Sequence, residues 1–200
     1  MWADPYPVPR YPVTYVSKVV SGSVKYINKD KPFWCIPQAF DWSVWDNGKL
    51  NGIHRPTDDE ERCMTYLALV NGAKGLIYWA YTSSRYQITD YPEHWAYMKK
   101  LAGEVSSLSP VLMTPTIEGK LVSSIKKDTL ETMVKKVNGA WYVFAVNSST
   151  APCKANLKLA GVKGGKLEVL YEQRSVSAKN GTWTDNFKPL EVHIYKLSAR

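Results

Sequence analysis

The sequence predicts two consecutive domains of different class, an α/β domain over residues 1–110 and an all-β domain over residues 111–200. In the first segment, short apolar runs alternate with stretches in which apolar residues recur every three or four positions, the spacing of one helical face. After Pro110 the spacing falls to two, as in half-buried strands. Composition changes at the same place: six of the eight tryptophans precede it, whereas the remainder holds 14 Lys and Arg against seven Asp and Glu.

The α/β segment begins with a strand, a helix and a second strand. Residues 1–6 have a strand-like composition. Residues 13–27 are predicted to form a helix with five apolar side chains on one face, namely Val13, Val16, Val20, Val24 and Ile27. Residues 32–40 are a continuous apolar run, which is typical of a parallel strand buried on both faces. Trp34, in the middle of this run, is therefore expected in the core.

The second helix has the clearest end signals in the chain. Residues 57–60, Thr-Asp-Asp-Glu, have the pattern of a capping box. In this motif the Thr57 hydroxyl accepts from the Glu60 amide, and the Glu60 side chain reaches back to the first residue. The helix is predicted to end at Asn71 and Gly72, a favourable pair for a helix C-terminus.

A third strand and a third helix complete the segment. Residues 75–81 are another apolar run of strand length, and residues 93–108 have the spacing of a helix that Pro110 closes. Three strand–helix pairs predict parallel strands with crossover helices. Because a (β/α)8 barrel takes about 250 residues, the segment is either an open α/β layer or a partial barrel, about its last three βα units. The partial barrel is favoured, because residues 1–6 start in mid-strand.

Residues 111–200 are predicted to form an antiparallel β-sandwich. Five segments show the two-residue period: 132–136, 140–147, 155–159, 166–171 and 191–197. Turn signals separate strands at Asn138-Gly139, Gly164-Gly165 and Asn180-Gly181. Short strands with frequent turns are typical of a sandwich.

Several classes of protein are disfavoured. No apolar run approaches the roughly 18 residues of a membrane span, so no membrane partner is expected. Cys35, Cys63 and Cys153 are far apart and odd in number, which predicts neither a disulfide framework nor a metal site. No glycine-rich phosphate loop appears, and no cofactor is expected. The lysines of the second domain are dispersed along alternating strands, which favours solvated strand faces and predicts no nucleic-acid partner.

A candidate site lies at the carboxyl ends of the predicted strands, where parallel β/α proteins place their functional residues. Aromatic, amide and acidic side chains gather there, with two arginines in the following loops: Asp4, Tyr6, Gln38, Asp41, Trp42, Trp45, Trp79 and Tyr81 at the strand ends, and Arg55 and Arg85 in the loops. Trp and Tyr offer flat apolar surfaces with a polar tip, and Asp, Gln and Arg hydrogen-bond hydroxyls. Such a set predicts a carbohydrate cleft. Trp42 and Trp45 are expected in this cleft, whereas Trp79 is compatible with either the cleft or the core.

Six segments of the chain carry a family resemblance: Asp4-Pro5-Tyr6-Pro7, residues 31–40, 55–75, 78–81, 141–147 and 191–195. They resemble the late part of the TIM-barrel glycoside hydrolases and their C-terminal sandwich, over nearly the whole chain. The resemblance implies that residues 1–6, 32–40 and 75–81 are the sixth, seventh and eighth barrel strands. It also implies that the last strand places an aromatic side chain, Trp79 or Tyr81, under a substrate sugar.

The chain departs from that family in its carboxylates. Many members carry a nucleophilic Glu at the end of the seventh strand, where this chain has Gln38, and their partner acid on the fourth strand would lie upstream of Met1. Hydrolysis needs two carboxyl groups, about 5 Å apart for retention or further for inversion. Asp4 and Asp41 are the strand-end carboxylates present, and Asp4 is the preferred catalytic candidate. The alternatives are a turn residue before Pro5 for Asp4 and a loop cap for Asp41.

Three functions stay open. The first is the C-terminal portion of a glycoside hydrolase of O-glycosidic bonds, incomplete by itself. The second is non-catalytic carbohydrate binding. The third is an assembly module, because an open α/β edge exposes apolar surface that self-association or a missing N-terminal barrel half would cover. The sugar, the linkage and the compartment are not predicted: the first residues lack signal-peptide features, although a secreted or periplasmic parent is compatible with the sequence.

Overall fold

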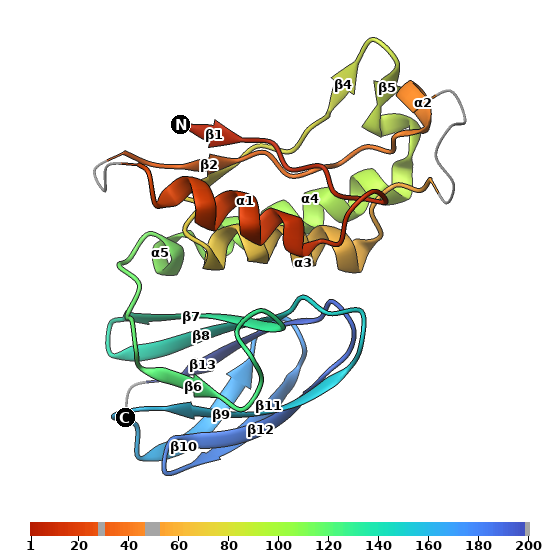
Figure 1. Cartoon of the computed structure of the whole chain (residues 1–200). Helices are drawn as coiled ribbons and strands as arrows, with labels where there is room; N and C mark the ends of the chain where they lie inside the picture. The colour runs from red at the N-terminus through yellow and green to blue at the C-terminus, as the bar shows by residue number, and fades with distance from the viewer. Residues whose placement is uncertain (28–30, 47–52, 199–200) are drawn as a thin grey trace. The chain divides into compact units, whose positions relative to one another are not determined.

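The computed structural model describes residues 1–27, 31–46 and 53–198. The chain forms two compact units, Met1–Leu108 and Ser109–Arg200, coloured from red to green and from green to blue in Figure 1. The first unit contains three parallel strands with helices, and the second contains one antiparallel sheet. In the described ranges every helix is too short or too polar to span a membrane.

The sheet of the first unit has the strand order β1 (Trp2–Ala3), β2 (Trp34–Cys35) and β3 (Gly75–Leu76). All three run parallel with their first residues in register, as the alternation of strands and helices predicted. The regular strands are shorter than the apolar runs that predicted them. Pro37 has no N–H to donate, and beyond it the pairing continues as a single bridge between Gln38 and Trp79.

The long helices α1 (Thr14–Val24), α3 (Asp58–Val70) and α4 (Pro92–Ser107) lie on one face of this sheet (Figure 1). Helix α1 buries Val16 and Val20, on its predicted apolar face. It ends before its predicted end, because Tyr26 and Ile27 donate to carbonyls three residues back in tighter turns. Four short elements were not predicted: α2 (Ser43–Asp46), β4 (Thr82–Ser83), β5 (Tyr86–Gln87) and the 3-10 helix η1 (Ile88–Asp90).

The capping box of α3 is confirmed. The Glu60 amide donates to the Thr57 hydroxyl oxygen at 3.3 Å, and the Thr57 amide donates to Glu60 Oε2 at 2.8 Å. The helix ends at Val70, followed by Asn71 as C-cap and by Gly72 with a φ of +107°. Local signals therefore fix both ends of α3.

The face of the sheet opposite the helices is apolar and exposed. Side chains on it include Trp2 (62% exposed), Trp34 (41%), Ile77 (51%) and Trp79 (46%). The expectation that Trp34 lies in the core is therefore wrong. Phe33 and Cys35 on either side of it are buried, because successive side chains of a strand point to opposite faces and only one face carries helices.

The second unit begins with α5 (Ser109–Leu112), so Pro110 lies within a short helix rather than after the last one. Eight strands follow in the spatial order β6-β9-β12-β11-β10-β13-β8-β7. Their bounds are β6 (Leu121–Ser123), β7 (Leu130–Val137), β8 (Ala140–Asn147), β9 (Cys153–Leu159), β10 (Gly164–Val169), β11 (Arg174–Lys179), β12 (Thr182–Phe187) and β13 (Val192–Leu197). Strands β6, β11 and β12 had not been predicted.

These strands form one hydrogen-bonded sheet, whereas the sequence interpretation expected the two sheets of a sandwich. The sheet curls so that its edges approach: Ile117, just before β6, donates to the Val134 carbonyl of β7 at 2.9 Å. The pair Gly164-Gly165, predicted as a turn, begins β10. Gly164 has a φ of +134°, and a side chain there would place its Cβ 2.6 Å from the Ala178 carbonyl oxygen of β11. Glycine therefore allows the close pairing of β10 and β11.

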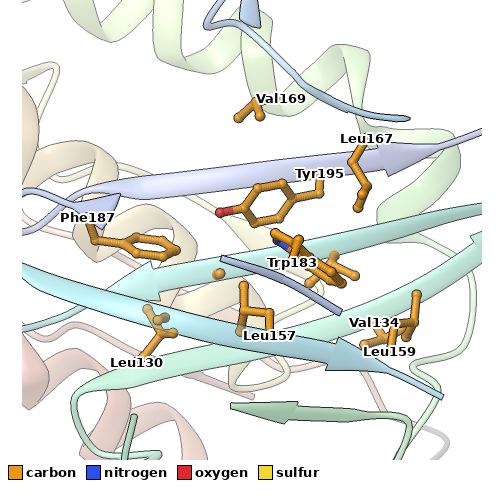
Figure 2. Packing of buried hydrophobic residues seen from close by; sticks show 12 residues of the cluster. Leu130, Val134, Leu157, Leu159, Leu167, Val169, Trp183, Phe187 and Tyr195 are labelled. Atoms are coloured by element: carbon orange, nitrogen blue, oxygen red, sulfur yellow. The ribbon is translucent and has the colours of Figure 1, made fainter. Parts of the chain in front are cut away.

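Alternate side chains of the curled sheet meet in one core, part of which is shown in Figure 2. The core residues labelled there are Leu130, Val134, Leu157, Leu159, Leu167, Val169, Trp183, Phe187 and Tyr195. The rings of Trp183 and Tyr195 are 5.3 Å apart in an edge-to-face arrangement. Contributions from β7, β9, β10, β12 and β13 make this a single interior shared by distant strands.

A network of charges joins the end of β10 to β11, β12 and β13. Arg174 contacts Glu172 at 2.7 Å and Asp185 at 2.9 Å. The ring of His193, almost fully buried, lies 2.5 Å from Glu172 Oε1. The hydroxyl of Tyr195 donates to Asp185 at 2.9 Å. Burial alone would raise the pKa of Glu172, but the hydrogen bonds and charges of His193 and Arg174 outweigh it and hold that pKa below its usual value.

Candidate functional site

The carboxyl ends of the three parallel strands lie at one edge of the sheet. Asp4 and Tyr6 follow β1, the segment from Gln38 to Trp45 follows β2, and Trp79 and Tyr81 follow β3. Backbone hydrogen bonds hold the second and third segments together, from Trp79 N to the Pro37 carbonyl at 3.0 Å and from Ala39 N to the Trp79 carbonyl at 2.5 Å. Most of the predicted site residues therefore belong to adjacent segments.

An aromatic cluster forms around Phe40. The rings of Tyr6, Trp42 and Trp45 lie edge-on to Phe40, with centroids 5.1, 5.1 and 4.8 Å away. All three of these predicted residues are partly buried. The indole N–H of Trp42 is buried and has no hydrogen-bond partner in the described part of the chain. The structure thus brings together three predicted aromatic residues and leaves one donor among them unused.

Arg10 adds a cation to this cluster. Its guanidinium lies 3.8 Å from the centroid of the Trp42 ring, a separation at which cation–π attraction is effective. The sequence interpretation missed Arg10, because it lies in the proline-rich loop after β1 and has no spacing that relates it to Trp42. The signal available in the sequence was an arginine between prolines, shortly after a predicted strand end.

A second aromatic group follows β3. Tyr81 lies edge-on to Trp95 of α4, with ring centroids 5.5 Å apart. Trp79 and Tyr81 are both exposed, so Trp79 is not a core residue. Arg55 lies over the ring of Tyr91, 3.7 Å from its centroid. Neither Trp95 nor Tyr91 had been predicted as a site residue: Trp95 was assigned only to the helix of residues 93–108, and Tyr91 lies before that range.

Gln38 has a role that differs from the predicted contact with substrate hydroxyls. Its side chain is fully buried. Its Oε1 accepts from the Val8 amide at 3.0 Å, and its Nε2 donates to the carbonyls of Val8 and Phe40 at 2.8 and 2.9 Å. These three bonds tie the loop after β1 to the segment after β2. Gln38 therefore holds the two segments that carry the aromatic cluster.

The two candidate carboxylates have different surroundings. Asp4 is exposed and hydrogen-bonds the Tyr6 hydroxyl. Burial of Tyr6, together with the charge and hydrogen bond of Asp4, raises the pKa of the tyrosine. Asp41 accepts hydrogen bonds from the backbone N–H and the hydroxyl of Ser43, at the start of α2. Asp41 thus makes the contacts of a loop cap, the alternative considered for it, whereas Asp4 presents its carboxylate to solvent beside an aromatic residue.

No protein-family model and no curated protein sequence matches this chain. In fold it is similar to the alpha-amylase of Geobacillus thermoleovorans, solved with acarbose, at 12% identity and a TM-score of 0.61, over 95% of this chain and 44% of that chain. It is also similar to AmyP, solved with maltose, at 10% identity and a TM-score of 0.62, over 98% of this chain and 50% of that one.

A third similar structure is a candidate alpha-galactosidase/melibiase of Bacteroides fragilis, at 12% identity and a TM-score of 0.57, over 93% of this chain and 38% of that chain. This chain therefore spans half the length of these structures or less. At such identities the likeness concerns the fold alone. The chain shares the fold of part of larger solved structures named for carbohydrate ligands or for action on carbohydrates.

Proposed function

We propose that this chain is a carbohydrate-active portion of a glycoside hydrolase, whose sugar cleft runs along the carboxyl edge of the three parallel strands. The observation that carries the proposal is the aromatic cluster of Tyr6, Phe40, Trp42 and Trp45 at that edge. The exposed rings of Trp79 and Tyr81 follow the neighbouring strand. Flat aromatic faces suit the apolar C–H faces of sugars.

Polar groups around these rings suit the hydroxyls of a sugar. Asp4 offers an exposed carboxylate beside these rings. Arg55 belongs to the proposed binding set through its position over Tyr91. Gln38 supports the cleft from beneath, through its three bonds to the two loops.

The fold proposal is that the first unit forms about the last three βα units of a (β/α)8 barrel. Helices on one face and exposed apolar side chains on the other suit a sheet that continues into a barrel, because parallel sheets are normally buried on both faces. The similar solved structures, about twice as long as this chain, support the same reading. The missing strands would come from a longer parent chain or from another chain.

The catalytic proposal is that Asp4 and Asp41 are the carboxylates of this portion. Asp4 is the stronger of the two, since the contacts of Asp41 with Ser43 already give it a structural role. Because the upstream strands of a barrel usually supply a further acid, the chain alone is expected to hydrolyse glycosides weakly or not at all. Turnover by this chain that Asp4→Asn abolishes would contradict that expectation and strengthen the assignment of Asp4.

The binding proposal is tested with maltose, acarbose and a broad glycan array as probes. Trp42→Ala and Trp79→Ala are each expected to weaken binding about tenfold, which corresponds to about 1.4 kcal/mol. Trp2→Ala is the matched control, because Trp2 is exposed on the same sheet but lies at its amino edge. Failure to bind any glycan, or equal losses in all three variants, would contradict the proposal.

The exposed sheet face favours a second candidate, an assembly module. Three tryptophans and Ile77 on one face form an apolar patch, and in the described sheet β1 and β3 are edge strands. Large apolar patches of this kind mark interaction sites. Sedimentation of the purified chain separates the candidates: a compact, stable monomer argues against an assembly role, whereas self-association lost in Trp34→Ser supports it.

A further inference from the structure

A buried acid and a buried histidine face each other in the first unit. Glu61, in the first turns of α3, is fully buried, and among the described residues neither of its carboxyl oxygens has a hydrogen-bond partner. His94, in the first turn of α4, is 7% exposed; its Nε2 lies 3.7 Å from Glu61 Oε1 and makes no hydrogen bond within the described ranges. Buried polar atoms without hydrogen bonds destabilise a fold. The protonation states of Glu61 and His94 therefore decide whether a hydrogen bond between them can form.

The other ring nitrogen of His94 is already engaged. The ring hydrogen-bonds the backbone of Ala39, and because Nε2 has no partner, the donor is Nδ1 and the acceptor is the carbonyl oxygen. The Tyr86 hydroxyl donates to the same carbonyl at 2.9 Å. A neutral ring with its proton on Nδ1 presents a lone pair at Nε2. That lone pair faces Glu61, so a carboxylate would repel it and a carboxylic acid would donate to it.

The surroundings of Glu61 disfavour its charged form. Burial is the largest cause that raises its pKa well above the usual range, and the charges of Glu60 and Asp58 on the same helix add to it. Besides His94, the titratable groups of neighbouring segments that interact with Glu61 are the hydroxyls of Tyr78, after β3, and of Tyr86 in β5. Neither tyrosine supplies a positive charge.

The surroundings of His94 also keep it neutral. Burial lowers its pKa most, and the nearby Arg55 lowers it further. The bond to Ala39 and the charge of Asp58 act in the opposite direction but do not reverse the result. A charged pair of Glu61 and His94 is therefore less favourable here than a neutral pair.

We propose that Glu61 is a neutral carboxylic acid that donates its proton to Nε2 of His94, and that the pair thereby holds the Ala39 carbonyl in place. In the proposed state the two atoms approach from 3.7 Å to hydrogen-bond distance. Glu61 and His94 are positioning residues: Ala39 leads directly to Phe40, and thus to the aromatic cluster. When base removes the proton from Glu61, a carboxylate faces the Nε2 lone pair, and His94 is driven off the carbonyl. The proposal does not depend on sugar binding.

The first test asks whether the carboxyl group of Glu61 is protonated at neutral pH. Infrared difference spectra of the wild type minus Glu61→Gln at pH 7 are expected to show the carbonyl stretch of a protonated carboxylic acid, shifted in D2O. Nitrogen-15 NMR of the wild type is expected to report a neutral His94 ring with an unprotonated Nε2. Absence of the acid band, or an imidazolium ring at neutral pH, would overturn the proposal even if the variant failed to fold.

The second test follows the alkaline transition by near-ultraviolet circular dichroism of the aromatic cluster. The wild type is expected to lose signal as the pH rises, in a step that Glu61→Gln lacks, because the Gln amide donates to Nε2 and cannot ionise. Glu61→Leu, which cannot donate, is expected to show the altered signal at every pH. Glu93→Gln is the matched control, since Glu93 is exposed next to His94, and should behave as the wild type. Identical profiles for the wild type and Glu61→Gln would overturn the proposal.

Discussion

The indole ring of Trp34 fills the space above Gly75. A Cβ placed on Gly75 would lie 2.5 Å from the Trp34 ring, closer than carbon atoms approach each other in proteins. The two residues are partners in the register of β2 and β3. A tryptophan on one strand thus requires a glycine on the next, and the pair sets how closely these strands pack on the exposed face.

Gly75→Ala is expected to destabilise the first unit by about 1–3 kcal/mol, the usual cost of overpacking. The double variant with Trp34→Ala should recover most of that loss, since the clash is removed. The matched control is Gly103→Ala in α4, which has no atom within 4 Å of the added Cβ. It should gain about 0.5–1 kcal/mol, because alanine favours helices over glycine. Urea unfolding measures all three, and equal losses at both glycines would refute the packing argument.

Gln38→Glu is expected to destabilise the chain rather than to create a nucleophile. A carboxylate can accept from the Val8 amide, but it cannot donate to the carbonyls of Val8 and Phe40 that Gln38 now binds. Burial would raise the pKa of the new carboxyl in the folded state, so stability should fall as the pH rises above about 4.3, its unfolded value.

The expected loss for Gln38→Glu at neutral pH exceeds about 2 kcal/mol, because two buried acceptors lose their donor and a charge is buried. Thermal unfolding at pH 5 and pH 8 measures it. The exposed Gln87→Glu is the control and should show little change at either pH. A Gln38→Glu protein as stable as the wild type at pH 8 would mean that the amide is not needed as a donor.

Acid should weaken the second unit through Glu172. Burial raises the pKa of Glu172, but the hydrogen bonds and positive charges of His193 and Arg174 lower it more, so the pKa lies below its usual value. A carboxyl group with a lowered folded pKa contributes stability above its unfolded pKa, near 4.5, and this contribution is lost as the pH falls through the folded value. Glu172→Gln should therefore flatten the pH dependence of unfolding below about pH 5. Glu168→Gln, at an exposed position of β10, should leave that dependence unchanged.

Gly181→Ala and Gly161→Ala separate steric clash from backbone strain. Both glycines have positive φ angles, +73° and +80°. A Cβ on Gly181 would collide with the carbonyl oxygen of Leu159, whereas one on Gly161 would meet nothing within 4 Å. Gly161→Ala should cost about 1 kcal/mol from strain alone, and Gly181→Ala clearly more. Chemical denaturation decides between the two, and an equal cost would show that the β9–β12 pairing adapts to the added carbon.

Local signals carried the correct predictions. The Thr57–Glu60 capping box and the Asn71-Gly72 pair involve neighbours in sequence, so α3 could be located without knowing the fold. The Asn138-Gly139 turn followed from its residue types, and the structure shows positive φ at both. The alternation of apolar runs likewise sufficed to predict parallel strands.

The burial of individual side chains and their contacts with distant segments could not be predicted from the sequence, because they depend on the tertiary fold. An apolar run has no period, so nothing in residues 32–40 tells which face of the strand meets helices, and Trp34 was placed on the wrong side. Gln38 was assigned to the cleft because its residue type suits hydroxyls; its three backbone partners are set by a loop 30 residues away. Glu61 follows three other acidic residues in the first turn of α3, and only the packed fold shows that it is buried.

The exposed apolar face of the first unit affects the aggregation and the degradation of the chain in a cell. Free strand edges and clustered tryptophans are features on which newly made chains aggregate, and partly exposed species are continuously triaged by chaperones and proteases. The abundance of this chain should therefore follow the supply of whatever covers Trp2, Trp34 and Trp79. Degradation of chains whose tryptophans stay exposed would then keep the amount of this polypeptide equal to the amount of the segment or chain that buries them.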